Sequence, residues 1–356
     1  MEPDTVETGT IDTGNGPRAF FSSGLEAKPT PFEAIPIIDF GPMLSGNLVQ
    51  RVKVGEAVRK ACTEVGFFYA INHSVSQGVI DATFGAAHRF FALPAETKAA
   101  IGVEKSDNNR GYTPLLGENT DPTAKGDMHE AFDFALELDA NDPDLGKGLF
   151  GYAPNQWPDE DTDFRDSLLT YQRDALAFGA LIFKAFALAL ELPEDYFAAK
   201  ITKPLAVTRV LHYPPQDGVI DEKQIGTGAH SDYECFTILC TDDKAALQVL
   251  NSAGEWIEAP PVEGAFIVNV GDMMERWTND YFKSTIHRAI NRTGKQRYSI
   301  PLFFGTNPDV EIAVLESCQS ATNPPRYEPV QAGAYVEQRI NETYAHRHDD
   351  AQGDHD

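Results

Sequence analysis

The sequence lacks a long hydrophobic run and is poor in cysteine and in basic residues. No apolar stretch approaches the roughly 20 residues that a membrane-spanning helix needs, so none is expected. The four cysteines form no C-x-x-C pair and are expected to be reduced core thiols. Lys and Arg total 29 against 54 Asp and Glu, a formal net charge of −25. Because an acidic surface repels polyanions, neither nucleic acid nor an anionic membrane is an expected partner.

The chain also lacks the motifs of several common enzyme classes. It has no G-x-S-x-G elbow, no phosphate-binding G-x-x-x-x-G-K-[ST] loop, no dinucleotide fingerprint and no H-E-x-x-H zinc helix. Its first residues, MEPDTVETGT, are acidic and polar and lack the basic start and apolar core of a secretory signal. A cytoplasmic location is therefore expected.

Composition divides the chain into three parts. Residues 1–30, rich in Gly, Thr, Pro and acidic residues, are expected to be a disordered or extended segment, and residues 341–356 a polar tail. Residues 31–340 are expected to form a single domain. Its N-terminal part, about 31–204, should be largely helical, and a β-core should occupy about 205–310.

The hydrophobic pattern changes along this domain. Apolar residues at three-and-four spacing predict helices over about 50–64, 76–94 and 162–192, whereas 107–150 has no clear period and predicts loops with short strands. From about 205, short apolar runs such as AVTRVLHYP, CFTILCTD, AFIVNVGD and RYSIPLFF recur between turn signals. This spacing is typical of a sandwich or barrel. The predicted fold class is mainly β with flanking helices.

A candidate metal site lies in the β-rich part. In GAHSDYECFTILC, His230 and Asp232 are two residues apart, so in an extended chain both side chains point to one face. His287, in STIHRAI, lies 55 positions after Asp232 and can supply a third ligand. Two histidines and one carboxylate leave adjacent positions on a metal open, which is the arrangement of iron(II) oxygenases. A structural zinc site would close its fourth position, usually with a thiolate, and no cysteine has suitable spacing.

A candidate carboxylate site follows the third ligand. Arg297 lies ten residues after His287, and Ser299 shares its face of the RYSIPLFF strand. A guanidinium beside a hydroxyl binds a carboxylate through charge-assisted hydrogen bonds.

These motifs, in this order, resemble one known family. Over roughly residues 33–340, the chain resembles the isopenicillin N synthase-like iron(II) and 2-oxoglutarate-dependent dioxygenases. The motifs that carry the resemblance are IPIIDF, GFFYAINH, FFALPAETK, RGYTP, LHYPP, HSD, IVNVGD, the distal His287 and the Arg297-x-Ser299 pair. The resemblance implies a double-stranded β-helix (jelly-roll) core and a monomer. Many plant members have asparagine where this chain has His212, whose role is left open.

The resemblance also implies the cofactors and their ligands. Fe(II) would be held by His230, Asp232 and His287, and dioxygen would be the second substrate. The far carboxylate of 2-oxoglutarate would be bound by Arg297 and Ser299, with a further hydrogen bond from Tyr213.

The prime substrate would be a small molecule, and seven residues are candidates to contact it. Two lie in a loop that often approaches the pocket in this family, and three alternate on a predicted strand near its mouth. One adjoins the carboxylate ligand, and one ends the RYSIPLFF strand. They are Arg110, Tyr112, Glu130, Phe132, Phe134, Tyr233 and Phe304.

The leading interpretation is an oxygenase that hydroxylates, desaturates or cyclises a small molecule of specialised metabolism. Two alternatives remain. Isopenicillin N synthase-type oxidases keep an Arg-x-Ser pair but use no 2-oxoglutarate, and a jelly roll can also be a binding protein without catalysis. A zinc hydrolase is disfavoured because no helix carries its ligand motif.

Overall fold

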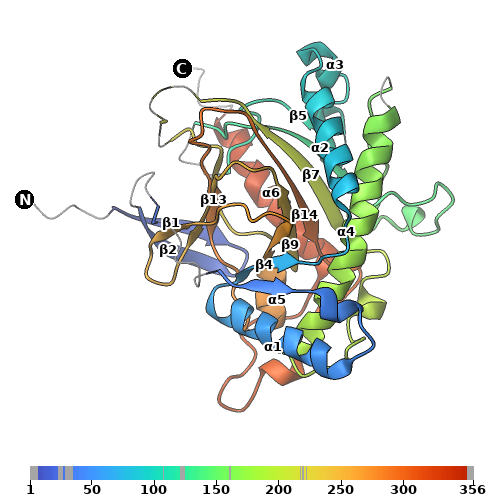
Figure 1. Ribbon diagram of the computed structural model, residues 1–356, viewed down its shortest axis with the longest axis vertical. Coiled ribbons are helices and arrows are strands. Elements are labelled where there is room, and N and C mark those ends of the chain that lie inside the picture. Colours follow the sequence, from blue (N-terminus) through green and yellow to red (C-terminus); the bar gives the residue numbers. More distant parts are fainter. Residues whose placement is uncertain are drawn as a thin grey trace, which may run out of the picture.

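Two β-sheets form the centre of the computed structural model, which describes residues 7–22, 27–28, 35–106, 108–120, 125–159, 162–216, 218, 220–221 and 223–350 (Figure 1). In the described residues the larger sheet has, in spatial order, strands β3 (Ile37–Asp39), β4 (Phe67–Ile71), β12 (Ala265–Val270), β9 (Phe236–Thr241), β14 (Arg297–Phe304), β7 (Ala206–Tyr213), β6 (Glu130–Ala135) and β5 (Gly111–Thr113). The smaller has β11 (Trp256–Glu258), β10 (Leu247–Leu250), β13 (His287–Ala289) and β8 (Thr227–His230).

The two sheets pack face to face. Phe67 and Ile267 of the larger sheet lie in one apolar cluster with Leu247 and Val249 of the smaller sheet. Nearly all ladders are antiparallel, as in a jelly roll; the pairing of β3 with β4 is parallel. The predicted class, mainly β with flanking helices, is confirmed.

Three long helices cover the outer face of the larger sheet. They are α1 (Leu48–Glu64), α2 (Gln77–Phe91) and α4 (Thr162–Ala189), and α2 and α4 run side by side in Figure 1. The predicted helices over 50–64 and 162–192 match α1 and α4. The one over 76–94 matches α2, which ends shortly before Pro94, and a short α3 (Ala95–Ala99) follows beyond the predicted end.

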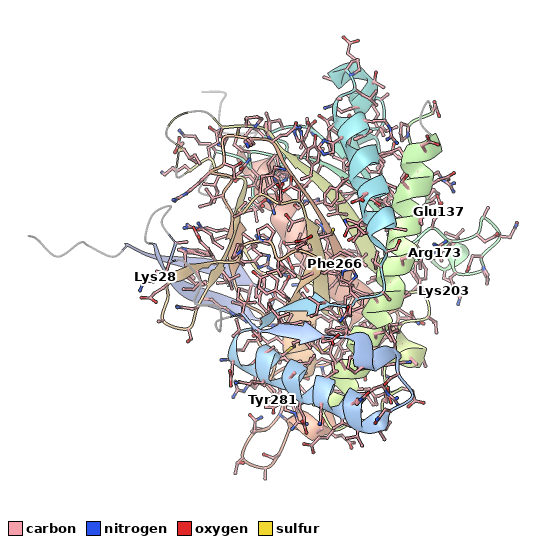
Figure 2. All side chains as sticks on the ribbon, viewed as in Figure 1. Lys28, Glu137, Arg173, Lys203, Phe266 and Tyr281 are labelled. Carbon is pink, nitrogen blue, oxygen red and sulfur yellow. The ribbon has the colours of Figure 1, made fainter. Side chains whose placement is uncertain are left out.

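Polar caps and aromatic contacts fix these helices. The Ser76 side chain accepts a hydrogen bond from the Val79 backbone N–H at 3.3 Å, which satisfies a donor at the start of α2. On the sheet side, the rings of Phe90 and Phe132 lie 5.2 Å apart. Figure 2 shows Phe266 inside the molecule, and its side chain is buried.

The remaining elements lie around the small sheet and the ends of the domain. They are β1 (Glu7–Thr13), β2 (Gly16–Ser22), α5 (Asp272–Trp277), β15 (Glu311–Ile312), β16 (Val330–Gln331) and α6 (Ala332–Asp350). Short 3-10 helices within the described ranges are Gly41–Leu44, Val103–Lys105, Leu145–Lys147, Ala198–Lys200 and Glu316–Cys318. Among all described helices, none combines the length and the apolar character needed to cross a bilayer.

An N-terminal hairpin and the C-terminal helix meet beside Tyr233. Where the sequence predicts a disordered or extended segment, β1 and β2 pair in antiparallel register, and α6 extends into the predicted polar tail. Arg339 of α6 donates a hydrogen bond to the Asp12 carbonyl oxygen at 3.2 Å, and its guanidinium lies 5.0 Å from the Tyr233 ring centroid. Segments from the two ends of the domain therefore contact each other and the loop after β8.

Candidate functional site

The three candidate metal ligands converge at one end of the smaller sheet. His230 ends β8 and pairs across the ladder with His287, which begins β13, and Asp232 follows β8 after one residue. Asp232 Oδ1 lies 3.6 Å from His230 Nε2 and 3.7 Å from His287 Nε2. One donor atom from each residue falls within 4.8 Å of the others, a spacing that a single metal ion can bridge.

Hydrogen bonds orient these donor atoms toward a common point. His230 Nδ1 lies 2.8 Å from the Gly228 carbonyl oxygen, and His287 Nδ1 lies 3.1 Å from that of Thr285. A carbonyl only accepts, so each Nδ1 carries the proton and each Nε2 lone pair is free for a metal. Asp232 Oδ2 accepts from Asn269 Nδ2 at 2.7 Å and from the Thr237 hydroxyl, which leaves Oδ1 for the metal. The donor set therefore fits Fe(II).

The charge states of the ligands agree with this arrangement. Burial, and then the neighbouring His287, lower the pKa of His230, which favours the neutral, metal-binding imidazole. Burial alone would raise the pKa of Asp232, but His287 and His230 lower it overall, so the carboxylate remains ionised.

The predicted carboxylate site lies on the facing strands. Arg297 on β14 is opposite Tyr213 on β7, and its guanidinium carbon lies 4.6 Å from the Tyr213 ring centroid. The guanidinium donates weakly to Ser299 Oγ at 3.4 Å and to Thr241 Oγ1 at 3.3 Å. No acidic side chain of the described residues pairs with this buried cation. Arg297 is therefore available to an anionic ligand.

A cavity of about 280 Å³ joins the metal and carboxylate sites. Residues of both sheets line it, together with Val336 and Ile340 of α6. Tyr213 also lines this cavity. Burial alone would raise the pKa of Tyr213, but Arg297 and then His129 lower it overall.

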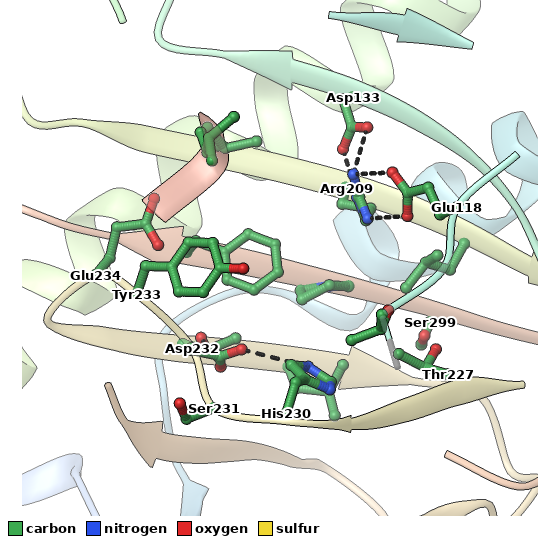
Figure 3. A pocket seen from close by; sticks show the side chains of 18 of the residues that line it. Glu118, Asp133, Arg209, Thr227, His230, Ser231, Asp232, Tyr233, Glu234 and Ser299 are labelled. Carbon is green, nitrogen blue, oxygen red and sulfur yellow. Dashed lines mark hydrogen bonds and ion pairs between the residues drawn. The ribbon is translucent and has the colours of Figure 1, made fainter. Parts of the chain in front are cut away.

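A group of four charged or titratable side chains, three of them buried, lies on another wall of the cavity. Arg209 of β7 bridges Asp133 of β6 and Glu118, with contacts of 2.7 Å and 2.6 Å, as Figure 3 shows. His129 Nε2 lies 3.2 Å from Glu118 Oε2. Burial would lower the pKa of His129, but Glu118 and Asp127 raise it to about 9. Burial would raise the pKa of Glu118, but Arg209 and His129 hold it well below its ordinary range.

Glu234 is a further acidic residue on the cavity wall, two positions after Asp232. Its side chain is buried, and no hydrogen bond or ion pair joins it to any other described residue. Burial, followed by the charge of Asp232, raises its pKa to about 7.

The structure brings only two of the seven expected substrate contacts, Arg110 and Tyr233, to the cavity wall. The guanidinium of Arg110 donates to the carbonyl oxygens of Gly151 and Ala153, so it also braces a loop. The other five face the helices on the outer side of the large sheet, which corrects the expectation. They are Tyr112, Glu130, Phe132, Phe134 and Phe304.

The reason for this correction is the alternation of side chains along a strand. Arg297 and Ser299 face the cavity, so Phe303 faces it as well, whereas Phe304 packs against Phe183 and Phe236. On β6 the cavity-facing residues are Asp133 and Ala135, not their neighbours. Glu130 instead binds Lys98, Tyr112 and His212 on the opposite face, at 2.6, 2.6 and 2.8 Å.

Sequence reasoning missed the charged cavity residues Glu118, His129, Asp133, Arg209 and Glu234. The parity of RYSIPLFF could have identified Phe303. Arg209 could have been found in the same way, because it is four residues from Tyr213 on β7 and therefore lies on the same face of the strand. Glu118 and His129 come from irregular segments in which the sequence has no periodic signal.

Comparisons with known proteins agree with this geometry. Residues 35–160 match the family model of the non-haem dioxygenase in morphine synthesis N-terminal domain, and residues 204–306 match that of the 2OG-Fe(II) oxygenase superfamily. The 2-oxoglutarate-Fe(II) type oxidoreductase hxnY of Emericella nidulans is 35% identical over 316 residues, covering 87% of this chain and 90% of the relative. A homoarginine-6-hydroxylase of Arabidopsis thaliana is 37% identical, with coverage of 81% and 82%.

A solved structure extends the similarity to three dimensions. A full-length Neurospora crassa protein, crystallised in complex with alpha-KG and thymine, superposes with a TM-score of 0.78 at 27% identity, covering 88% of this chain and 99% of that protein. The jelly-roll core expected from the motifs is thereby confirmed. The chain belongs to the 2OG-Fe(II) oxygenase superfamily and is an iron(II)- and 2-oxoglutarate-dependent oxygenase.

Proposed function

We propose that His230, Asp232 and His287 hold the iron, and that Arg297, Ser299 and Tyr213 bind the far carboxylate of 2-oxoglutarate. The cavity between them would hold a small molecule of specialised metabolism. The observation that supports this most directly is the orientation of the donors: each Nδ1 is engaged by a carbonyl and Asp232 Oδ2 by two donors, which leaves three atoms free for one metal.

Each group of residues has a distinct part in the reaction. When bound, iron and 2-oxoglutarate supply the oxidising chemistry, in which dioxygen is consumed and 2-oxoglutarate is decarboxylated to succinate. Arg297 and Ser299 set the orientation of the co-substrate by fixing its charged end. Leu211, Leu239 and Leu247 line the cavity and reduce the access of water.

The buried cation Arg297 suits the far carboxylate of 2-oxoglutarate, and the family matches favour that co-substrate over an oxidase reaction without it. A dicarboxylate whose near end reaches the metal would place its far carboxylate against a guanidinium that has no acidic partner among the described residues. Hydroxylation, desaturation and ring closure all remain compatible with this site. The cytoplasmic location and the monomeric state stay predictions of the sequence.

The proposal is tested by succinate formation and by 2-oxoglutarate binding. Arg297→Ala should weaken 2-oxoglutarate binding by roughly 10- to 100-fold, because a charge-assisted bidentate contact is lost. Metal binding should be unchanged. Arg173→Ala, an exposed α4 variant, is the control. Unchanged 2-oxoglutarate affinity in Arg297→Ala, or substrate oxidation without succinate, would contradict the proposal.

A further inference from the structure

The carboxyl group of Glu234 differs from the other acidic groups on the cavity wall. Asp232 is held by Asn269 and Thr237, and Glu118 and Asp133 share Arg209. Glu234 is only 7% exposed, and apart from its own backbone N–H none of the described residues gives its carboxyl group a hydrogen bond or a countercharge. A buried carboxylate without a countercharge is unfavourable, so such a group in a cavity calls for a cationic ligand.

The position of Glu234 places it at the substrate end of the cavity. A Cβ built on Gly305 would stand 3.4 Å from Glu234 Cγ and 3.3 Å from Leu205 Cβ, so these three residues adjoin. Glu234 lies beside Tyr233 and on the opposite side of the view from Ser299 in Figure 3. It is therefore separate from the residues proposed to hold 2-oxoglutarate.

The surroundings of Glu234 are mostly apolar. Pro204, Leu205, Phe303, Val336 and Ile340 line the same cavity. A low-dielectric environment strengthens the attraction between opposite charges, and it also favours a ligand with an apolar stem. A second anion would be repelled from this wall by Glu234 itself.

We propose that the prime substrate carries a basic nitrogen, as an amine, amidine or guanidine on a short apolar stem, and that Glu234 binds this group. This inference rests on the proposed function, because it concerns the substrate of the same site. Glu234 and Asp232 belong to one short loop between β8 and β9. A nitrogen held by Glu234 therefore leaves the stem carbons close to the metal ligands, where oxidation takes place.

The test uses the protein loaded with manganese(II) and 2-oxoglutarate. Manganese accepts oxygen and nitrogen ligands, and its unpaired electrons broaden the NMR signals of ligand protons close to it. The probes are n-alkylguanidinium ions, from ethyl to hexyl, and the matching uncharged n-alkylureas. At least one guanidinium should bind the wild-type protein about tenfold or more tightly than its urea, with broadened stem signals.

Two variants test whether the preference for guanidinium ions over ureas depends on the Glu234 carboxyl group. Glu234→Gln should bring each pair of probes to similar affinity, whereas Glu263→Gln, a control at an exposed acid, should keep the wild-type preference. Equal binding or no binding of both probe series by the wild-type protein would overturn the inference. Tighter binding of the ureas, or a preference that survives in Glu234→Gln, would do the same.

The same samples separate this inference from the proposed function. Failure of 2-oxoglutarate to bind the manganese protein would contradict the proposed function, whatever the probes do. Binding of 2-oxoglutarate without any preference for the guanidinium series would contradict only the role of Glu234.

Discussion

Ser231 donates its hydroxyl hydrogen to Asp272 Oδ2 at 3.0 Å, which ties the residue between the proposed metal ligands His230 and Asp232 to the start of α5. Asp272 is fully buried and also accepts from Ser284 Oγ at 2.6 Å and from the Gly14 backbone N–H at 3.0 Å. Its own N–H donates to the Asp232 carbonyl oxygen at 2.8 Å. Asp272 thus supports the ligand loop from behind, without facing the cavity.

Removal of the Asp272 carboxylate should weaken metal binding. Asp272→Ala leaves three donors without this acceptor, and loss of such supporting contacts typically lowers metal affinity about 10- to 100-fold. Manganese(II) titration measures this. Asp272→Asn keeps an acceptor oxygen and should lose less affinity than Asp272→Ala. A metal affinity equal to wild type in a folded Asp272→Ala protein would mean that the ligand loop holds its geometry alone.

Removal of the anionic ligand should abolish activity. In Asp232→Ala the metal loses its only carboxylate, so binding should fall by at least about 100-fold and succinate formation should cease. Because the variant also removes a buried charge, its fold should survive and can be checked by circular dichroism. Turnover close to the wild-type rate would rule out the assigned ligand set.

The pair of His129 and Glu118 should make stability depend on pH. The pKa of His129 is raised from 6.5 to about 9, so its stabilising effect is complete below pH 6.5 and is lost as the pH rises toward 9. The full effect corresponds to up to roughly 3 kcal/mol. His129→Gln should therefore show a smaller decrease of Tm than wild type between these pH values. Parallel pH profiles of the two proteins would contradict the raised pKa.

The pKa of Glu118 is lowered, so the contribution of this residue to stability depends on pH in the opposite direction. Its contribution is present above the ordinary carboxyl pKa and is lost as the pH falls through the lower, folded value. Glu118→Gln should therefore be less sensitive to acid than wild type, although less stable at neutral pH. Acid titration followed by tryptophan fluorescence measures this difference, and identical acid midpoints would argue against it.

The contacts of Arg18 predict that the N-terminal hairpin stabilises the domain. Arg18 pairs with the buried Glu275 and donates to the Ser284 carbonyl oxygen. Arg18→Ala leaves the Glu275 carboxyl without its countercharge and should reduce the free energy of unfolding by about 1–3 kcal/mol. Arg173→Ala, which breaks an exposed pair with Asp174, should cost less than about 0.5 kcal/mol. Equal urea midpoints for the two variants would exclude a stabilising role for the hairpin contact.

The sequence predicted the fold class and the family well, because short motifs in a required order carry much information. His230, Asp232 and His287 could be grouped in advance, since period-two spacing and family order both apply to them. The sequence did not show which face of β6 borders the cavity. All six residues of Glu130–Ala135 are buried, so hydrophobicity does not distinguish the two faces, and only the pairing of Asp133 with Arg209 does.

The hairpin was missed for a related reason. Residues 1–30 have the composition of an unstructured segment, and β1 and β2 are ordered by partners more than 250 positions away, Asp272 and Glu275. Local composition contains no record of such distant contacts.

The contact of Arg339 with Asp12 and Tyr233 has a consequence for biosynthesis. Asp12 and Arg339 are 327 positions apart in the sequence, so the hairpin and α6 must come together before the loop that carries Asp232 is fully supported. While the ribosome is still translating α6, the jelly roll can form but this support is absent. Stable uptake of iron should therefore follow the synthesis of α6, and a chain that stops before Arg339 should fold but bind manganese(II) more weakly in a titration.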